Sequence, residues 1–160
     1  MPISIRSRGE IEKLKQAGKI VADVLCKLKK ETRPGVSTGY LNEIALEMTS
    51  QAGAIALFKG VRSPYARKPF PGAICASVNE EVVHGIPSKL VKVKEGDILS
   101  IDFGVKYKGY CGDSAITIAV GRISPEKQRL MDVTQKLLDI AIQSAAPGVR
   151  WTAIDRKSVV

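Results

Sequence analysis

The feature that most constrains this chain is a predicted β-hairpin that carries two acidic residues. Residues 97–106 and 111–120 are strand-like and flank Lys108-Gly109, which we expect at the tip of the hairpin. Each run contains one acid in apolar surroundings, Asp102 in the first and Asp113 in the second. The hairpin therefore predicts where two carboxylates lie relative to each other.

The position of the turn decides whether these acids share a face. With Lys108-Gly109 as the two turn residues, Asp113 lies opposite Gly104, and Asp102 lies on the same face, diagonal to Asp113. Diagonal neighbours are about 7–8 Å apart at the backbone, within reach of two side chains that converge on one ion. A register shifted by one residue would instead place the acids on opposite faces. We therefore expect a shared cation or proton, since two buried like charges repel. The alternative is that both acids cap turns or face water.

The only histidine of the chain follows a second strand-like segment, Ile74–Val83, which a predicted turn at Asn79-Glu80-Glu81 interrupts. His84 precedes Gly85, which leaves the neighbouring backbone uncovered, and an imidazole there can exchange a proton near neutral pH. The alternative is a surface or hydrogen-bonded structural histidine. The loop at residues 58–72, rich in glycine and proline, either lines a site or is a simple connection.

Composition restricts the class of protein. A chain of 160 residues is long enough for one domain with a real core. It has no apolar run that could span a bilayer and no hydrophobic leader at its N-terminus. Three scattered cysteines indicate reduced thiols in a cytoplasmic protein. The net charge of +9 favours a solvated basic surface, with ribosome proximity as one reason for it. We expect neither DNA nor a membrane as a partner.

Three helices are predicted around these strands. The first has a capping box at Ser7–Glu10 and ends at Arg33-Pro34-Gly35, and the second runs from about Ser37 to Gly53. A third begins after Ser124 and ends at Pro147-Gly148. All three have apolar residues at helical spacing.

The third helix repeats the first after a shift of 113 residues. The apolar stripes match, and Pro34-Gly35-Val36 falls on Pro147-Gly148-Val149. This predicts a single, incomplete duplicated domain over 1–160, with a first pseudo-repeat at 1–123 and the start of a second at 124–160. The alternative is a complete small α+β domain with a frayed end.

Three segments of the sequence resemble the type I methionine aminopeptidases. They are Phe70–Pro87, Lys94–Gly104 and Gly109–Ser114. The match covers nearly the whole chain. It implies the family's α+β "pita-bread" fold, here as its first half plus the opening helix of the second, which agrees with the internal repeat.

The resemblance also implies roles for particular residues. The family is expected to remove the initiator methionine from nascent chains with two divalent ions, for which Co, Mn, Fe and Zn are all candidates. Asp102 and Asp113 fall on the two aspartate ligand positions, and His84 falls on a histidine that contacts the substrate near the scissile amide. Cys75 and Phe70 match positions that line the pocket for the methionine side chain.

The chain also departs from the family pattern. A further histidine ligand, a second substrate histidine and two glutamates of the family are expected beyond residue 160. The resemblance therefore predicts a metalloaminopeptidase chain that is inactive or impaired by itself. A non-catalytic module that binds ribosomes or nascent peptides is the alternative function. A proline-specific peptidase of the same fold is a further alternative, against which the Phe70–Pro87 segment argues.

Overall fold

The computed structural model describes residues 4–64 and 67–158. By internal contacts the chain divides into two compact units, Met1–Arg122 and Ile123–Val160. The interpretation of 1–123 and 124–160 as pseudo-repeats stays a prediction. No helix in the described part is long and apolar enough to cross a lipid bilayer.

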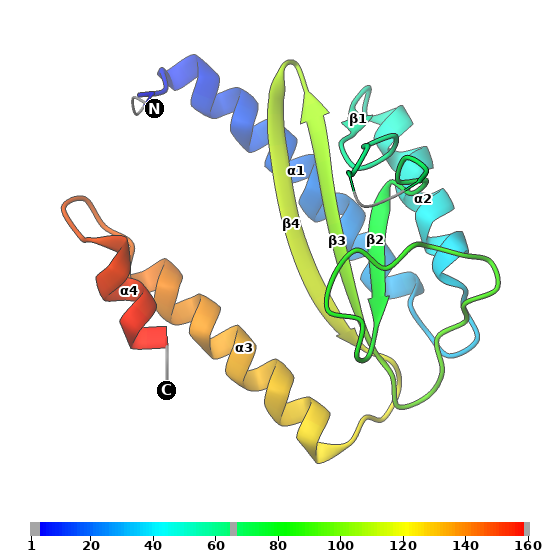
Figure 1. Ribbon diagram of the computed structural model, residues 1–160. Helices are drawn as coiled ribbons and strands as arrows, with labels where there is room; N and C mark the ends of the chain where they lie inside the picture. Colours follow the sequence, from blue (N-terminus) through cyan, green and yellow to red (C-terminus); the bar gives the residue numbers. More distant parts are fainter. Residues whose placement is uncertain (1–3, 65–66, 159–160) are drawn as a thin grey trace. The chain divides into compact units, whose positions relative to one another are not determined.

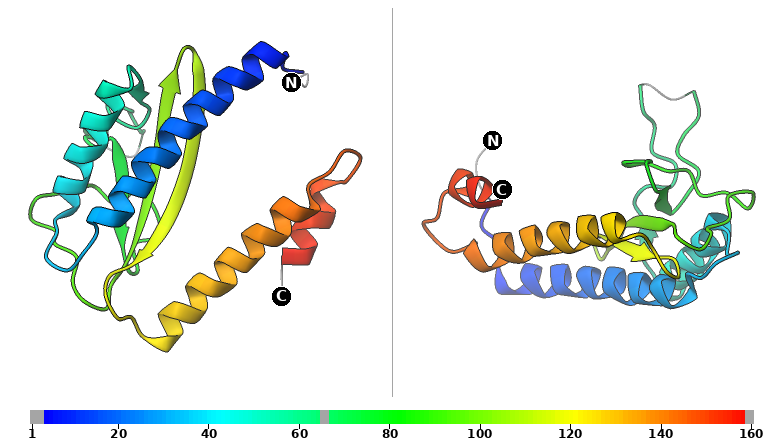
Figure 2. Two further views of the ribbon diagram at one scale, coloured as in Figure 1. Left: turned by 180° about the vertical axis from the view of Figure 1, so that it is seen from behind. Right: turned by 90° about the horizontal axis from the view of Figure 1, so that it is seen from below.

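The first unit is an antiparallel sheet covered on one face by two helices. In chain order its elements are α1 (Arg8–Glu31), α2 (Thr38–Gln51), β1 (Ile55–Ala56), β2 (Ile74–Val78), β3 (Ile98–Tyr107) and β4 (Tyr110–Ala119). β3 is central, with β4 on one edge and both β2 and β1 on the other. Figures 1 and 2 show α1 and α2 on the same face of this sheet.

The core lies between the helices and the sheet because side chains alternate along each strand. Ile101, Phe103 and Val105 of β3 are fully buried and belong to the same core cluster as Val21 and Leu28 of α1. Asp102 and Gly104, the residues between them, therefore face the other side of the sheet. The predicted site lies on that face, opposite the two helices.

The predicted hairpin and helices are confirmed. β3 pairs with β4 so that Tyr107 lies opposite Tyr110, with Lys108-Gly109 as the turn. Both turn residues have positive φ, 48° and 85°, as a type I′ hairpin turn requires. The first two helices begin after Ser7 and Ser37, whose side chains accept hydrogen bonds from backbone N–H groups of the first turn.

The predicted turn at Asn79-Glu80-Glu81 is confirmed, and β2 ends directly before it, at Val78. The strand-like interpretation of Val82 and Val83, after the turn, is wrong. Asn79 has a φ of 54°, which ends the extended conformation, and the following residues form a turn with no strand partner among the described residues. Val82 and Val83 are 85% and 63% exposed. The apolar run thus mixes a buried strand with an exposed loop, and apolar content alone does not separate them.

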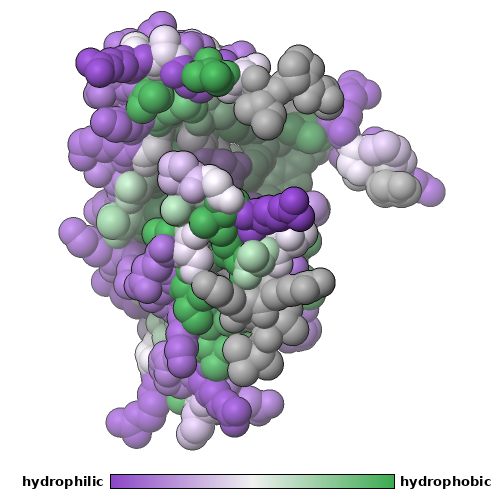
Figure 3. Space-filling model, turned by 90° about the vertical axis from the view of Figure 1, so that its left-hand side faces the viewer, coloured by the Kyte–Doolittle hydropathy of each residue, from purple (hydrophilic) through white to green (hydrophobic). Residues whose placement is uncertain are grey.

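The second unit consists of α3 (Pro125–Ser144) and α4 (Trp151–Ser158). The cap at Ser124 is confirmed, and α3 ends before Pro147-Gly148. α3 has no buried residue, and Leu130, Val133 and Leu138 of its apolar stripe are each about half exposed. In the view of Figure 3, hydrophobic side chains (green) reach the surface between hydrophilic ones.

The capping box of α1 gives a prediction about pH. Glu10 accepts hydrogen bonds from the Ser7 backbone N–H at 2.8 Å and from the Tyr110 hydroxyl at 3.2 Å. Hydrogen bonds from Ser7 lower the pKa of Glu10 from 4.5 to about 2. A carboxylate whose pKa is lower in the folded state stabilises the protein above its unfolded pKa, and the effect is lost as the pH falls. We expect Glu10→Gln to lower Tm at pH 7, and the difference from wild type to shrink between pH 4.5 and pH 2.

Thermal unfolding of the wild type and of Glu10→Gln, followed from pH 7 to pH 2, tests this prediction. Glu12→Gln is the matched control because the only ion pair of Glu12 with a described residue is an exposed contact with Lys15 at 3.9 Å. A difference in Tm that stays constant from pH 7 to pH 2 would contradict a role for the Glu10 charge.

Candidate metal and substrate site

The two acids lie as the hairpin predicts. Asp113 is directly opposite Gly104, and Asp102 is opposite Ala115, two residues along the strand and on the same face. A Cβ atom on Gly104 would lie 2.8 Å from Oδ2 of Asp113. The absence of a side chain at Gly104 therefore gives the Asp113 carboxylate its space beside Asp102.

The environment of Asp102 disfavours a bare negative charge. Burial raises the pKa of Asp102, and the charge of Asp113 raises it further. His84 acts in the opposite direction and lowers it. A second negative charge close to Asp102 is an arrangement that a bound cation would relieve.

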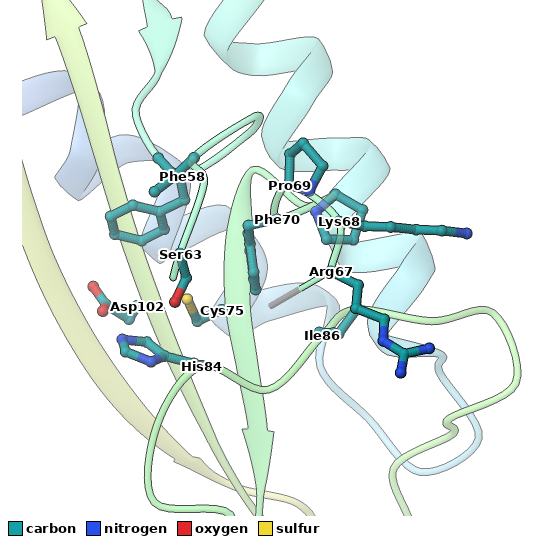
Figure 4. A pocket seen from close by; sticks show the side chains of 12 residues that line it. Phe58, Ser63, Arg67, Lys68, Pro69, Phe70, Cys75, His84, Ile86 and Asp102 are labelled. Atoms are coloured by element: carbon teal, nitrogen blue, oxygen red, sulfur yellow. The ribbon is translucent and has the colours of Figure 1, made fainter. Parts of the chain in front are cut away.

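Next to Asp102 is a cavity of about 700 Å³. Four residues singled out from the sequence line it: Phe70, Cys75, His84 and Asp102. In Figure 4 the His84 imidazole and the Cys75 thiol lie close to the Asp102 carboxylate. Asp113 is not among the described residues that line the cavity; it lies beside Asp102, over Gly104.

The strand β2 brings Cys75 to this site. Cys75 pairs with Asp102 across the β2–β3 ladder, so both side chains lie on the face of the sheet opposite α1 and α2. Oδ1 of Asn42, on α2, accepts hydrogen bonds from the backbone N–H groups of Ala73 at 2.7 Å and Ile74 at 3.4 Å. These bonds tie the start of β2, and with it the cavity wall, to the helix layer.

Cys75 is a buried, unreactive thiol in this setting. It is 5% exposed, and burial, with smaller contributions from Asp102 and Asp113, raises its pKa to about 11. Because the thiolate is the nucleophilic form, Cys75 is suited to lining an apolar pocket rather than to nucleophilic chemistry. Cys26 and Cys111 are exposed.

The sequence left open whether the loop at residues 58–72 lines a site, and it did not identify which side chains form the remaining cavity walls. They come mostly from the loop after β1 and from the segment after His84: Phe58, Val61, Ser63, Arg67, Lys68, Pro69, Pro71 and Ile86. Arg67 and Lys68 point away from the group around Asp102 in Figure 4. In the sequence, the only indication of these walls is that residues 58–72 are rich in glycine and proline. This composition predicts a loop, but it does not predict which side chains of the loop line a cavity.

The donor set fits part of a metal site. Carboxylate oxygens bind hard and borderline divalent ions, and Asp102 and Asp113 lie diagonal to each other on the same face of the hairpin. Within residues 4–64 and 67–158, no group of three or more His, Cys, Asp and Glu side chains is arranged to hold a metal ion. Asp102 and Asp113 thus stay predicted ligands of an open site, to which other groups must contribute.

Comparison with known proteins identifies the family. The sequence profile of metallopeptidase family M24 matches residues 12–159, which is nearly the whole chain. The chain belongs to metallopeptidase family M24. Its curated M24 relatives include the methionine aminopeptidase of Aquifex aeolicus, 47% identical over 148 residues, and methionine aminopeptidase 1 of Bacillus subtilis, 46% identical over 145 residues. These matches cover 92% and 91% of this chain but 57% and 56% of the two relatives, so the chain spans a little over half their length.

Solved structures confirm the fold. The crystal structure of a methionine aminopeptidase from Thermotoga maritima matches with a TM-score of 0.89 and 38% identity, over 99% of this chain and 62% of that one. The expected α+β pita-bread fold is therefore confirmed for the part that this M24 chain contains. Family membership also implies divalent metal ions as cofactors.

Proposed function

We propose that this chain carries the methionine pocket and part of the metal centre of a methionine aminopeptidase, an enzyme that removes N-terminal methionine from nascent proteins and peptides in the cytoplasm. The observation that carries the proposal is the cavity at which Phe70, Cys75, His84 and Asp102 meet. The names of the M24 relatives at 46–47% identity support the same substrate.

The cavity suits a methionine side chain. Its walls include Phe58, Val61, Phe70 and Ile86, and the Cys75 thiol adds a polarisable sulfur. A thioether gains from burial against apolar groups and from contacts with aromatic rings. In the proposal Phe70 and Cys75 hold the methionine side chain, which places the first peptide bond near Asp102.

The polar residues then act on that peptide bond. Asp102 and Asp113 would hold divalent metal ions, two in a complete site, with Co, Mn, Fe and Zn as candidates. Bound metal supplies Lewis acidity at the site. The imidazole N–H of His84 would donate a hydrogen bond to the amide after methionine and stabilise charge that develops there.

We propose that the 160-residue chain alone is inactive or impaired. Two carboxylates are an open and weak metal site, and the described residues offer no larger ligand group. They also include no second histidine, because His84 is the only one in the sequence. We therefore expect the 160-residue chain to bind a peptide that begins with methionine but to hydrolyse it slowly or not at all.

The second candidate function is a non-catalytic module that binds ribosomes or nascent peptides. The net charge of +9 favours it, because such a surface attracts RNA at low salt. It predicts cosedimentation with ribosomes that is lost at high salt and does not depend on Asp113.

The test compares Met-Ala-Ser with Gly-Ala-Ser, which lacks the methionine side chain. Calorimetry in the presence of Mn²⁺ should show Met-Ala-Ser binding about ten- to a hundredfold more tightly, the equivalent of burying one large apolar side chain. Phe70→Ala should remove this preference. Tyr40→Ala is the matched aromatic control, since Tyr40 lies on α2 and is 45% exposed.

Equal affinity for the two peptides would contradict the methionine pocket. Release of methionine from the same mixtures, measured with Co²⁺ or Mn²⁺, separates the two candidate functions. Cleavage that is abolished in Asp113→Ala would establish the enzyme in this chain, and salt-sensitive ribosome binding without methionine-selective peptide binding would favour the module.

A further inference from the structure

The segment that carries His84 is fastened to β2 through the next residue, Gly85. The Gly85 carbonyl accepts a hydrogen bond from the Ala76 N–H at 2.9 Å. The Gly85 N–H donates to Oγ of Ser77 at 3.0 Å, in a buried setting. Both backbone polar groups of Gly85 are therefore bonded to two consecutive residues of the strand.

This fastening brings the two backbones into direct contact. A Cβ atom on Gly85 would lie 2.3 Å from the Ala76 carbonyl oxygen and 2.8 Å from Cα of Ser77. Side chains cannot occupy such a position, so only glycine allows the segment to cross β2 this closely.

His84 itself has a backbone conformation that needs support. Its φ is 61°, in the left-handed region that non-glycine residues adopt only when their surroundings impose it. The two hydrogen bonds of Gly85 are the restraints immediately next to it along the chain. They hold the backbone that directs the imidazole into the cavity.

Ser77 is an unusual residue to find buried in this strand. It is 3% exposed, and its side chain lies on the same face of β2 as Cys75, the face that lines the cavity. A buried hydroxyl is costly without a partner. The hydrogen bond from the Gly85 N–H gives it one.

We propose that Ser77 is a positioning residue: its hydroxyl holds Gly85 against β2 and thereby fixes His84 over the cavity. A consequence for catalysis rests on the proposed function, in which His84 contacts the peptide bond. The effect of Ser77 on the conformation of His84 does not depend on the proposed function, so it can be tested separately.

NMR spectroscopy of the full 160-residue chain tests the proposal. His84 is the only histidine, so its imidazole gives a single set of signals. In Ser77→Ala we expect hydrogen exchange of the Gly85 amide to accelerate about tenfold, the effect of losing one hydrogen bond. The imidazole signals should also shift toward those of a short unstructured histidine peptide.

Two further variants separate positioning from general stability. Ser77→Thr keeps a hydroxyl acceptor and should restore both the exchange rate and the imidazole signals. Ser100→Ala is the matched control, because Ser100 pairs with Ser77 across the ladder but its hydroxyl contacts that of Thr117 at 2.9 Å. It should leave the His84 signals unchanged, whatever it does to Tm.

Unchanged His84 signals in Ser77→Ala would overturn the proposal, and so would an equal change in Ser100→Ala. Adding Met-Ala-Ser to the same samples tests the proposed function independently. If the peptide fails to perturb the wild-type His84 signals but Ser77→Ala still moves them, the positioning role stands and the substrate assignment fails.

Discussion

Replacing Asp113 by asparagine is expected to reduce the affinity of the chain for Mn²⁺ by at least about 100-fold, because even groups that only support a metal ligand cost about 10–100-fold when removed. The charge of Asp113 raises the pKa of Asp102, and a cation bound by both carboxylates would relieve that repulsion. Asparagine keeps the shape but removes the charge. Titration of free Mn²⁺ by electron paramagnetic resonance measures the loss.

The control for this variant is Asp23→Asn. Asp23 is an exposed aspartate on α1 whose side chain forms an ion pair with Lys19 at 3.2 Å. Asp23→Asn should leave Mn²⁺ binding unchanged, since an exposed carboxylate that is paired with a lysine is not expected to bind the metal. Equal Mn²⁺ affinity in Asp113→Asn and wild type would show that the two acids are not a metal site.

Phe103→Ala is expected to lower the free energy of unfolding by about 3–5 kcal/mol, the range for truncating a buried aromatic side chain to alanine. Phe103 is fully buried and is among the largest buried side chains of the first unit. It lies between Asp102 and Gly104 in sequence but points to the helix-covered face, so its loss removes packing beneath the site.

Urea denaturation followed by circular dichroism gives this energy. Val82→Ala serves as the control because Val82 is 85% exposed, and its truncation should change stability by less than about 0.5 kcal/mol. A loss below about 1 kcal/mol for Phe103→Ala would mean that the layer between β3 and the helices does not hold the unit together.

Local sequence rules predicted the hairpin well. The turn at Lys108-Gly109 fixes the register of two ten-residue strands, and with it the relation of Asp102 to Asp113. The capping serines placed the starts of α1, α2 and α3 in the same way. In each case the decisive residues are neighbours in the sequence, so the information is local.

Long-range packing explains what the sequence did not predict. β1 is only two residues long and exists because it pairs with the far end of β3. Val82 and Val83 are apolar but lie in no strand, because only Ile74–Val78 has a partner on β3. Such pairings depend on residues distant in the chain.

The residues of the candidate site also differ in how they were predicted. Its acids came from the hairpin pattern, and His84 was singled out as the one histidine, directly after a strand-like segment. Phe70 and Cys75 came from a family resemblance, and the structure brings them to the cavity together with His84. Their roles in binding metal and substrate stay predictions. The support of His84 by Ser77 through Gly85 was not predicted, because it requires a loop to cross a strand at contact distance.

The most direct test of the central claim, that Asp102, Asp113 and His84 form one metal and substrate site, is the effect of Mn²⁺ on the NMR signals of the His84 imidazole. Mn²⁺ bound by the two acids should broaden these signals selectively at low metal concentration, and Asp113→Asn should abolish the broadening. Sharp His84 signals at a Mn²⁺ concentration that broadens other parts of the protein would contradict the account.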